Sequence, residues 1–251
     1  MVLTPSVKYI CNKAFDCELD KISHFKLHPE LKPFVGEKYG SKLSEGKNGI
    51  LLIGESHYIK DGLTAESFSK WYEATTEEII NSFPPEYQEA NPDIKNWFDT
   101  RHVICDNYLN GHQYRSKTIF SNPAKVLCKI CESDGGLLCP AKEQEAFTYF
   151  SFMNFFQRPE VCEGKSFIAS KTDIFKANEI LKDVIQVLRP SKVIFVSKHA
   201  FSSSDSESMS RELKMEINYT VHPTSAWWNR SEGKYGSKKF ENLVSPIFKN
   251  T

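Results

Sequence analysis

The sequence lacks several features that would point directly to a function. Its 32 Lys and Arg residues balance its 32 Asp and Glu residues, so it has none of the excess positive charge of proteins that coat nucleic acid. Neither an apolar stretch of about 20 residues nor an apolar export signal near residues 1–13 is present. The P-loop, GxGxxG and HExxH patterns are absent as well. We therefore expect a globular cytoplasmic protein without membrane contact.

Cysteine is present, but not in a pattern that indicates disulfides or a metal. The number is odd, and most of the cysteines lie in apolar stretches, as reduced core thiols do. Cys128 and Cys131 have the spacing of a metal-binding pair, yet they lie on a predicted amphipathic helix, and no second close pair exists. We expect no metal and no cofactor. The seven cysteines are Cys11, Cys17, Cys105, Cys128, Cys131, Cys139 and Cys162.

What the sequence does contain is typical of one globular domain. The chain has 251 residues, of which 40% are hydrophobic, and this length can form a single core. We expect one domain over residues 1–251. Residues 1–48 are turn-rich and are predicted to form an N-terminal arm, and residues from about 73 to 143 are predicted to form a helical insertion.

The order of apolar segments predicts the fold. Residues 50–53 and 193–196 are apolar at every position, as in parallel strands buried on both faces. Because strands alternate with helices, we predict an α/β fold, a three-layer α/β/α sandwich with a short, mainly parallel sheet. Further strands are predicted at residues 147–156 and 217–221, and helices at 64–83, 94–108, 122–131, 172–188 (capped by Thr172 or Asp173) and 207–215.

Three loops at predicted strand ends carry polar and aromatic residues. They are residues 54–58 (Gly-Glu-Ser-His-Tyr), 154–159 (Asn-Phe-Phe-Gln-Arg-Pro) and 222–228 (His-Pro-Thr-Ser-Ala-Trp-Trp). In open parallel sheets, functional groups lie on the loops at the carboxyl ends of strands. No single motif identifies a function, because a glycine in a turn or a histidine in the core would give the same local sequence.

Taken in this order, the three motifs resemble those of the uracil-DNA glycosylase superfamily. Residues 54–58 resemble its first motif, Asn154 followed by Arg158-Pro159 resembles its middle motif, and residues 222–225 resemble its His-Pro-Ser motif. The resemblance covers residues from about 49 to 249 and rests on motif order. It implies a divergent member that hydrolyses the N-glycosidic bond of a damaged base in DNA, most plausibly uracil, by base flipping.

The residue types suit that chemistry. His222 can donate a hydrogen bond to a developing base anion, and a neutral His would do so as an electrophile. Asn154 offers the donor and the acceptor that reading a pyrimidine edge requires. The backbone at Gly54 adds donors, and Glu55 or Ser56 could position water.

Further residues are expected to contact the base and the DNA. The resemblance implies that Tyr58 crowds the uracil 5-position, and Phe68 or Trp71 could stack on a flipped base, although a helix core stripe is the commoner role. The resemblance also implies an apolar wedge in the minor groove at Trp227 and Trp228, with a covering role for the sheet end as the equal alternative. The expected DNA contacts are Arg158, Ser225, Trp227, Trp228, Arg230, Lys234 and Lys238, and Lys239 is expected to complete a basic rim.

Departures from the family pattern leave alternatives open. Ser56 occupies the position of the catalytic Asp of the most active branch, and His57 replaces the customary Pro. Either Glu55 substitutes for the Asp, or His222 acts alone, or activity is lost. A catalytically inactive nucleic-acid or nucleobase binding protein and a small-molecule hydrolase therefore stay as alternatives to a monomeric DNA glycosylase.

Overall fold

The computed structural model describes residues 8–40, 48–59, 62–111, 118–133, 140, 142–161, 167–230 and 234–248. Its centre is a five-stranded sheet in the order β1-β3-β2-β4-β5. All neighbouring strands are parallel except β1, which pairs antiparallel with β3. The strands are β1 (Phe34–Val35), β2 (Asn48–Gly54), β3 (Phe150–Asn154), β4 (Pro190–Phe195) and β5 (Glu216–Tyr219). The predicted α/β sandwich with a short, mainly parallel sheet is confirmed.

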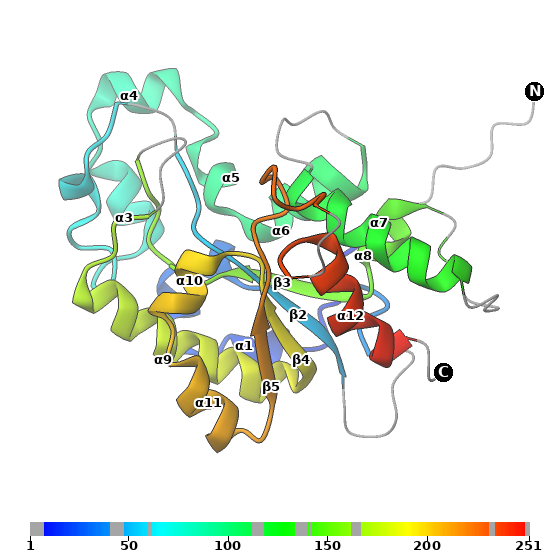
Figure 1. Cartoon of the computed structure of the whole chain (residues 1–251). Helices are drawn as coiled ribbons and strands as arrows, with labels where there is room; N and C mark the ends of the chain where they lie inside the picture. Colours follow the sequence, from blue (N-terminus) through cyan, green and yellow to red (C-terminus); the bar gives the residue numbers. More distant parts are fainter. Residues whose placement is uncertain are drawn as a thin grey trace, which may run out of the picture.

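Helices cover both faces of this sheet (Figure 1). On one side lie α7 (Thr118–Ser133), α8 (Glu143–Phe147) and α12 (Ser237–Phe248); on the other lies α9 (Lys171–Leu188). The remaining helices are α1 (Asp16–Leu19), α2 (Ser23–Leu27), η1 (Pro29–Leu31), η2 (Ala65–Phe68), α3 (Thr76–Asn81), α4 (Pro85–Ala90), α5 (Ile94–Phe98), α6 (Thr100–His102), the π-helix η3 (Val103–Leu109), α10 (Lys198–Ser203) and α11 (Ser206–Glu212).

The alternation of side chains along β2 divides the apolar interior into two cores. Leu51 and Ile53 pack in the core under α9, whereas Ile50 and Leu52 pack in the core under α7 and α12. Successive strand residues point to opposite faces, so an uninterrupted apolar run serves both cores at once. This explains why β2 and β4 were recognisable as runs without alternation.

Several predicted boundaries were wrong. The strand predicted at 147–156 begins only at Phe150, because Phe147 ends α8. The helix predicted at 64–83 is a short 3-10 helix, turns, and then α3. The helix predicted at 122–131 already includes Thr118, so Pro123 lies in its interior. The predicted arm contributes β1 to the sheet. Helix α9 is capped by Ser170, with Asp173 as its reciprocal partner.

Candidate functional site

The site lies where the parallel strands end. Gly54 and Asn154 are the last residues of β2 and β3 and are paired in register. The loop after β5 supplies His222 at the same edge. The chain leaves β2 towards β3 on one side and later continues from β4 to β5 on the other, so the order reverses between β2 and β4. Ligands of open α/β sheets bind at such a switch point.

Asn154 presents its side-chain amide beside Gly54. A β-carbon at residue 54 would collide with Oδ1 of Asn154 and approach the Phe152 ring to 2.7 Å. Asn154 is 7% exposed, yet within the described ranges its amide makes no hydrogen bond. A nearly buried polar group normally has a partner, since leaving it without one costs about 1–3 kcal/mol. The amide is thus available to a ligand at this edge.

Glu55 is held by three donors. Its Oε1 accepts from the Tyr58 hydroxyl at 3.1 Å and from the Phe167 N–H at 2.9 Å. Its Oε2 accepts from the Ser197 hydroxyl at 2.6 Å. Since a carboxylate offers about four lone-pair positions, one on Oε2 is left for a water or a ligand. The carboxylate is therefore fixed in place at the switch point.

His222 is neutral and oriented. Its Nδ1 accepts the backbone N–H of Thr224 at 3.3 Å and lies 2.7 Å from the Thr224 hydroxyl. Because Nδ1 accepts, the ring proton lies on Nε2, which can donate to a ligand. Burial lowers the pKa of His222, and the nearby Glu55 carboxylate opposes part of that shift. On α7, Asn122 fixes the loop by donating to the Pro223 carbonyl at 2.7 Å.

Ser56 and His57 have structural roles in the loop after β2. The Ser56 hydroxyl lies 3.1 Å from the carbonyl oxygens of both His57 and Arg158, so it ties two loops together. This arrangement argues against the predicted catalytic role of Ser56. His57 is buried beside the Thr100 hydroxyl, at 3.3 Å, and burial lowers its pKa to about 4.

The aromatic residues proposed to shape a base pocket differ in their placement. Tyr58 lies at the site and donates its hydroxyl to Glu55. Phe68 is 1% exposed and packs edge-on against Trp71 and Phe83 in the core under α9. Trp71 is fully buried and stacks on His28 with 4.2 Å between ring centroids. Phe68 and Trp71 therefore belong to the core, which was the alternative reading.

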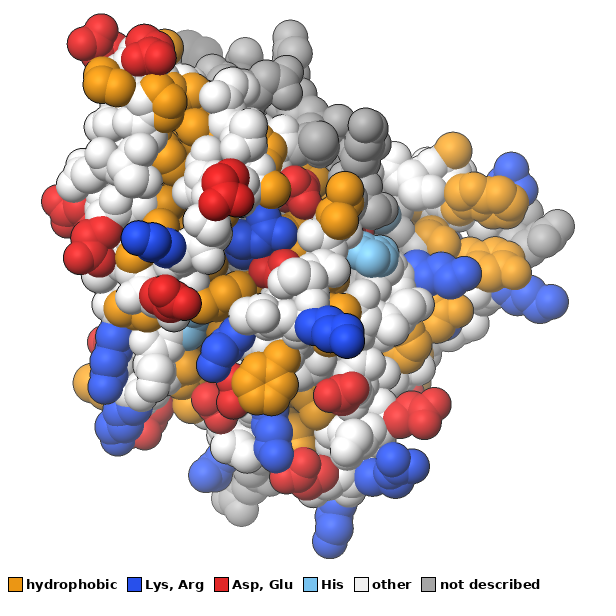
Figure 2. All heavy atoms as spheres, turned by 90° about the vertical axis from the view of Figure 1, so that its left-hand side faces the viewer, with side chains coloured by type: hydrophobic (Ala, Val, Ile, Leu, Met, Phe, Trp, Pro, Cys, Tyr) orange, Lys and Arg blue, Asp and Glu red, His pale blue; other side chains and the backbone are white. Residues whose placement is uncertain are grey.

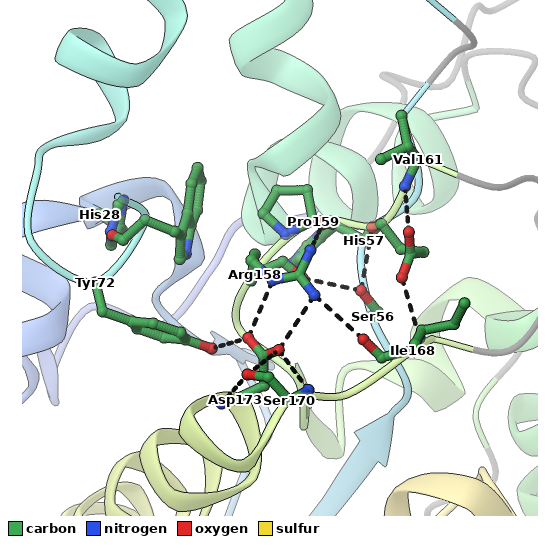
Figure 3. A network of polar contacts seen from close by, with 12 residues as sticks. His28, Ser56, His57, Tyr72, Arg158, Pro159, Val161, Ile168, Ser170 and Asp173 are labelled. Atoms are coloured by element: carbon green, nitrogen blue, oxygen red, sulfur yellow. Dashed lines mark hydrogen bonds and ion pairs between the residues drawn. The ribbon is translucent and has the colours of Figure 1, made fainter. Parts of the chain in front are cut away.

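Arg158 points into the protein (Figure 3). Its guanidinium donates to both carboxylate oxygens of Asp173, at 3.0 and 3.1 Å, and the side chains are 11% and 2% exposed. Tyr72 also donates to Asp173, at 2.9 Å. Although burial opposes it, hydrogen bonding to Arg158 and Ser170 lowers the pKa of Asp173. The predicted DNA contact at Arg158 is replaced by a bidentate ion pair that anchors the loop after β3.

The two adjacent tryptophans differ in exposure, so one fits the covering role and the other fits the wedge role. Trp228 is 2% exposed and packs against Phe240 of α12, which is a covering role. Trp227 is 48% exposed, and the Arg230 guanidinium lies 3.5 Å from its ring centroid. Ser225 shapes this turn, because its hydroxyl accepts the Trp227 N–H at 3.1 Å. Trp227 alone is placed to meet a partner.

Only part of the predicted basic rim consists of exposed cations, and that part lies in the segment after Trp227. Arg230 and Lys234 are exposed, Lys238 pairs with Glu241 at 3.1 Å, and Lys239 lies over the Tyr219 ring. On the face seen from the left of Figure 1, Lys and Arg side chains are interspersed with Asp and Glu (Figure 2). Of the predicted rim, Arg230 and Lys234 are exposed cations that follow Trp227.

Sequence reasoning missed three residues that organise the site. Ser197 binds Glu55, Asp173 pairs with Arg158, and Asn122 holds the His222 loop. Ser197 directly follows an apolar strand, the signal that identified Glu55 and Asn154, and could have been found from it. Asp173 was assigned only to a helix start, and nothing in the sequence linked Asn122 to residue 223.

Searches for a metal site, a membrane-spanning helix and related proteins give no further indication of function. Within the described residues, no group of His, Cys, Asp and Glu side chains suits a metal ion, and no helix has the length and apolarity for crossing a membrane. Cys139 and Cys162 lie outside those residues. A scan against protein-family models finds no match, and a search of curated proteins finds none either.

Proposed function

We propose that this protein is a DNA glycosylase that hydrolyses the N-glycosidic bond of a damaged or deaminated base, with uracil as the preferred base, after the base has been flipped from the stack. The observation that carries the proposal is the Asn154 amide, nearly buried and without a partner in the described structure, beside Gly54 at the sheet edge that also bears His222. An amide with a donor and an acceptor matches the edge of a pyrimidine.

The proposed reaction divides its work among three side chains. Asn154 holds the base edge, while the Nε2–H of His222 donates to the base oxygen on which negative charge develops as the N-glycosidic bond breaks. The fixed Glu55 carboxylate stabilises the positive sugar and orients water. Water adds to the sugar C1′, and its proton ends on the released base, which leaves an abasic site without a cofactor.

DNA contact is proposed for the loop that follows His222. Exposed Trp227 can fill the space that the flipped base leaves, and Arg230 and Lys234 can contact phosphates. We propose that the enzyme acts as a monomer. We also propose a cytoplasmic protein, in keeping with the five described cysteines, which form no disulfide with one another.

The proposal is tested with labelled oligonucleotides, single-stranded and duplex, that contain uracil, hypoxanthine or xanthine. We expect an abasic product from at least one base, with the rate reduced roughly 100-fold or more in His222→Ala and in Asn154→Ala. Asn96→Ala and His102→Ala are matched controls at exposed and half-exposed positions outside the site. Absence of an abasic product from the folded wild-type protein with every base would reject the enzyme.

A catalytically inactive nucleobase or nucleic-acid binding protein is the second candidate. It is favoured by the loop after β2, where Ser56 replaces a carboxylate and is bound to backbone carbonyls. In that case, oligonucleotide binding would be salt-sensitive and would weaken in Asn154→Ala, while no base is released by any variant.

A further inference from the structure

Two exposed aromatic rings lie against each other beside the loop that carries His222. Trp227 is 48% exposed and Tyr235 is 41% exposed. Their ring centroids are 6.2 Å apart, and the ring planes differ by 75°. Among the residues that the structure describes, no other two exposed rings are in contact. Exposed aromatic side chains that are held together in this way are suited to meeting a partner.

Backbone contacts fix Tyr235 next to this loop. Its carbonyl oxygen accepts the Val221 N–H at 3.2 Å, one residue before His222. The following residue, Gly236, lies so close to Trp228 that a β-carbon at residue 236 would collide with the Trp228 carbonyl. Tyr235 is therefore tied to the loop on both sides of the candidate DNA contact, and its ring position follows from the fold.

Positive charge accompanies the two rings. The Arg230 guanidinium lies 3.5 Å from the centroid of the Trp227 ring, and exposed Lys234 immediately precedes Tyr235. The segment 227–239 has one acid, Glu232, and four cations, which are Arg230, Lys234, Lys238 and Lys239. Rings among cations match a ligand that carries flat groups along a chain of negative charges. A strand of nucleic acid has this chemistry.

The angle between the rings distinguishes an unpaired strand from a duplex. Successive bases in a duplex are stacked parallel to one another. Two rings whose planes differ by 75° cannot both lie flat against parallel bases. The bases of a single strand can unstack and turn independently, so one base can lie on Trp227 while a neighbour lies on Tyr235. The geometry therefore favours single-stranded DNA.

We propose that Trp227, Tyr235 and Arg230 form a stacking platform for two unpaired bases of single-stranded DNA, with Arg230 and Lys234 contacting the phosphates. This inference rests on the proposed function, because it names single-stranded DNA as the preferred substrate of the same site. In a single strand, a base enters the site without the cost of breaking a base pair. Binding at the platform requires no damaged base, so it is measured separately from base release.

The test measures binding of the folded protein to a labelled oligothymidylate strand, and to the same strand annealed to oligoadenylate, by fluorescence anisotropy. Neither ligand contains a damaged base. We expect wild type to bind the single strand about 5-fold or more tightly than the duplex, and Tyr235→Ala to lose this difference, since stacking of one base contributes an effect of this size. Equal or tighter binding of the duplex by wild type, or single-strand binding by Tyr235→Ala equal to that of wild type, would overturn the proposal.

Two variants separate stacking from a structural role. Tyr235→Phe keeps the ring and should bind the single strand as wild type does. Phe175→Ala is the matched control, because Phe175 on α9 is 59% exposed and has the Lys176 amine 5.4 Å from its ring centroid, but contacts no second exposed ring in the described structure. It should leave binding unchanged. Binding that weakens equally in Phe175→Ala and Tyr235→Ala would contradict a specific platform.

Tryptophan fluorescence reports the stacking directly. A base stacked on the Trp227 ring should quench its emission, so oligothymidylate should quench wild type more than Trp227→Phe. This readout does not depend on changes in stability. Equal quenching in the two proteins would show that bound bases do not reach Trp227 and would overturn the proposal.

Failure of the platform can be distinguished from failure of the proposed function. Base release by a protein whose single-strand binding is unaffected by Tyr235→Ala would reject the platform and retain the glycosylase. Single-strand binding that depends on Tyr235, without release of any base, would retain the platform and reject the glycosylase.

Discussion

Gly54 and Asn154 stand opposite each other in β2 and β3, and the Asn154 amide fills the space that a β-carbon at residue 54 would need. Glycine is required here by space, because the approach of a neighbouring side chain leaves no room. The smallest residue at one strand end thus permits the polar side chain at the next to face the proposed site.

Gly54→Ala is expected to destabilise the protein by about 1–3 kcal/mol, as an overpacked core position does, and to displace the Asn154 amide. Urea denaturation measures the first effect and oligonucleotide cleavage the second. Because Asn154→Ala removes the colliding Oδ1, the double variant should lose less stability than the sum of the single variants. Additive losses would show that the two residues do not interact.

Three buried histidines are expected to make the protein sensitive to acid. Burial lowers the pKa of His24 to about 3 and those of His28 and His57 to about 4. Above pH 6.5 both folded and unfolded forms are neutral. As the pH falls below 6.5, the unfolded chain binds protons that the folded chain does not, so the free energy of unfolding falls by about 1.4 kcal/mol per pH unit for each histidine.

Urea denaturation at pH 7, 6 and 5 checks this slope, and His24 allows a sharp control. Its Nε2 is buried without a hydrogen-bond partner within the described residues, so His24→Leu should keep the stability of wild type at pH 7 and exceed it at pH 5. Asn96→Ala, at an exposed position without a titratable group, should leave the slope unchanged. A slope in His24→Leu equal to that of wild type would be inconsistent with a neutral, buried His24.

The charge state of His222 should depend on Glu55. Burial lowers the pKa of His222 and the Glu55 carboxylate raises it, so Glu55→Gln is expected to shift this pKa further down. Titration of the imidazole signals by NMR measures the shift. Cleavage activity should persist as the pH falls through 6.5 and be lost only where the lowered pKa is crossed. If the pKa of His222 were the same in Glu55→Gln as in wild type, the Glu55 carboxylate would have no influence on the charge of His222.

Removal of the Arg158 side chain should lower stability, whereas removal of the Arg230 side chain should change oligonucleotide binding. Arg158→Ala leaves Asp173 buried without its partner and is expected to lower stability by about 3–5 kcal/mol. Arg230→Ala should leave stability unchanged and reduce the salt dependence of oligonucleotide binding by about one phosphate contact. Binding at several salt concentrations, beside urea denaturation, distinguishes them. A folded Arg158→Ala that loses only salt-sensitive binding would restore the role predicted from the sequence.

The adjacent tryptophans give a similar contrast. Trp228→Ala opens a cavity against Phe240 and should lower stability by about 3–5 kcal/mol. Trp227→Ala removes an exposed ring and should leave the melting temperature close to that of wild type while it weakens oligonucleotide binding. Fluorescence anisotropy with a labelled oligonucleotide measures the binding. Unaltered binding by Trp227→Ala would remove this ring from the proposed interface.

Features formed by residues that are contiguous in the sequence could be predicted, whereas features that depend on distant residues could not. The apolar runs of β2 and β4 and the polar residues after them are contiguous, so the sheet and the positions of Glu55, Asn154 and His222 could be predicted. The two-residue strand β1 has too short a pattern to recognise, and it exists because of its pairing with β3. The end of α8 was predicted as part of a strand because Phe147, Tyr149 and Phe150 are aromatic and Thr148 is β-branched, and strands favour both types.

Side-chain partners could not be predicted in the same way. Arg158 read as a surface cation because its partner lies on another element, and only the fold brings Asp173 within 3.0 Å. Phe68 and Trp71 were ambiguous, since a helix core stripe and a stacking surface use the same residues. Trp227 and Trp228 are neighbours with opposite exposure, a distinction that depends on the position of α12.

The most direct test of the proposed function is single-turnover release of uracil from a duplex oligonucleotide by wild type, Asn154→Ala and the control Asn96→Ala. The proposal predicts base release by wild type and by Asn96→Ala, with a rate roughly 100-fold or more lower in folded Asn154→Ala. Equal rates in all three proteins would contradict the central role of the Asn154 amide.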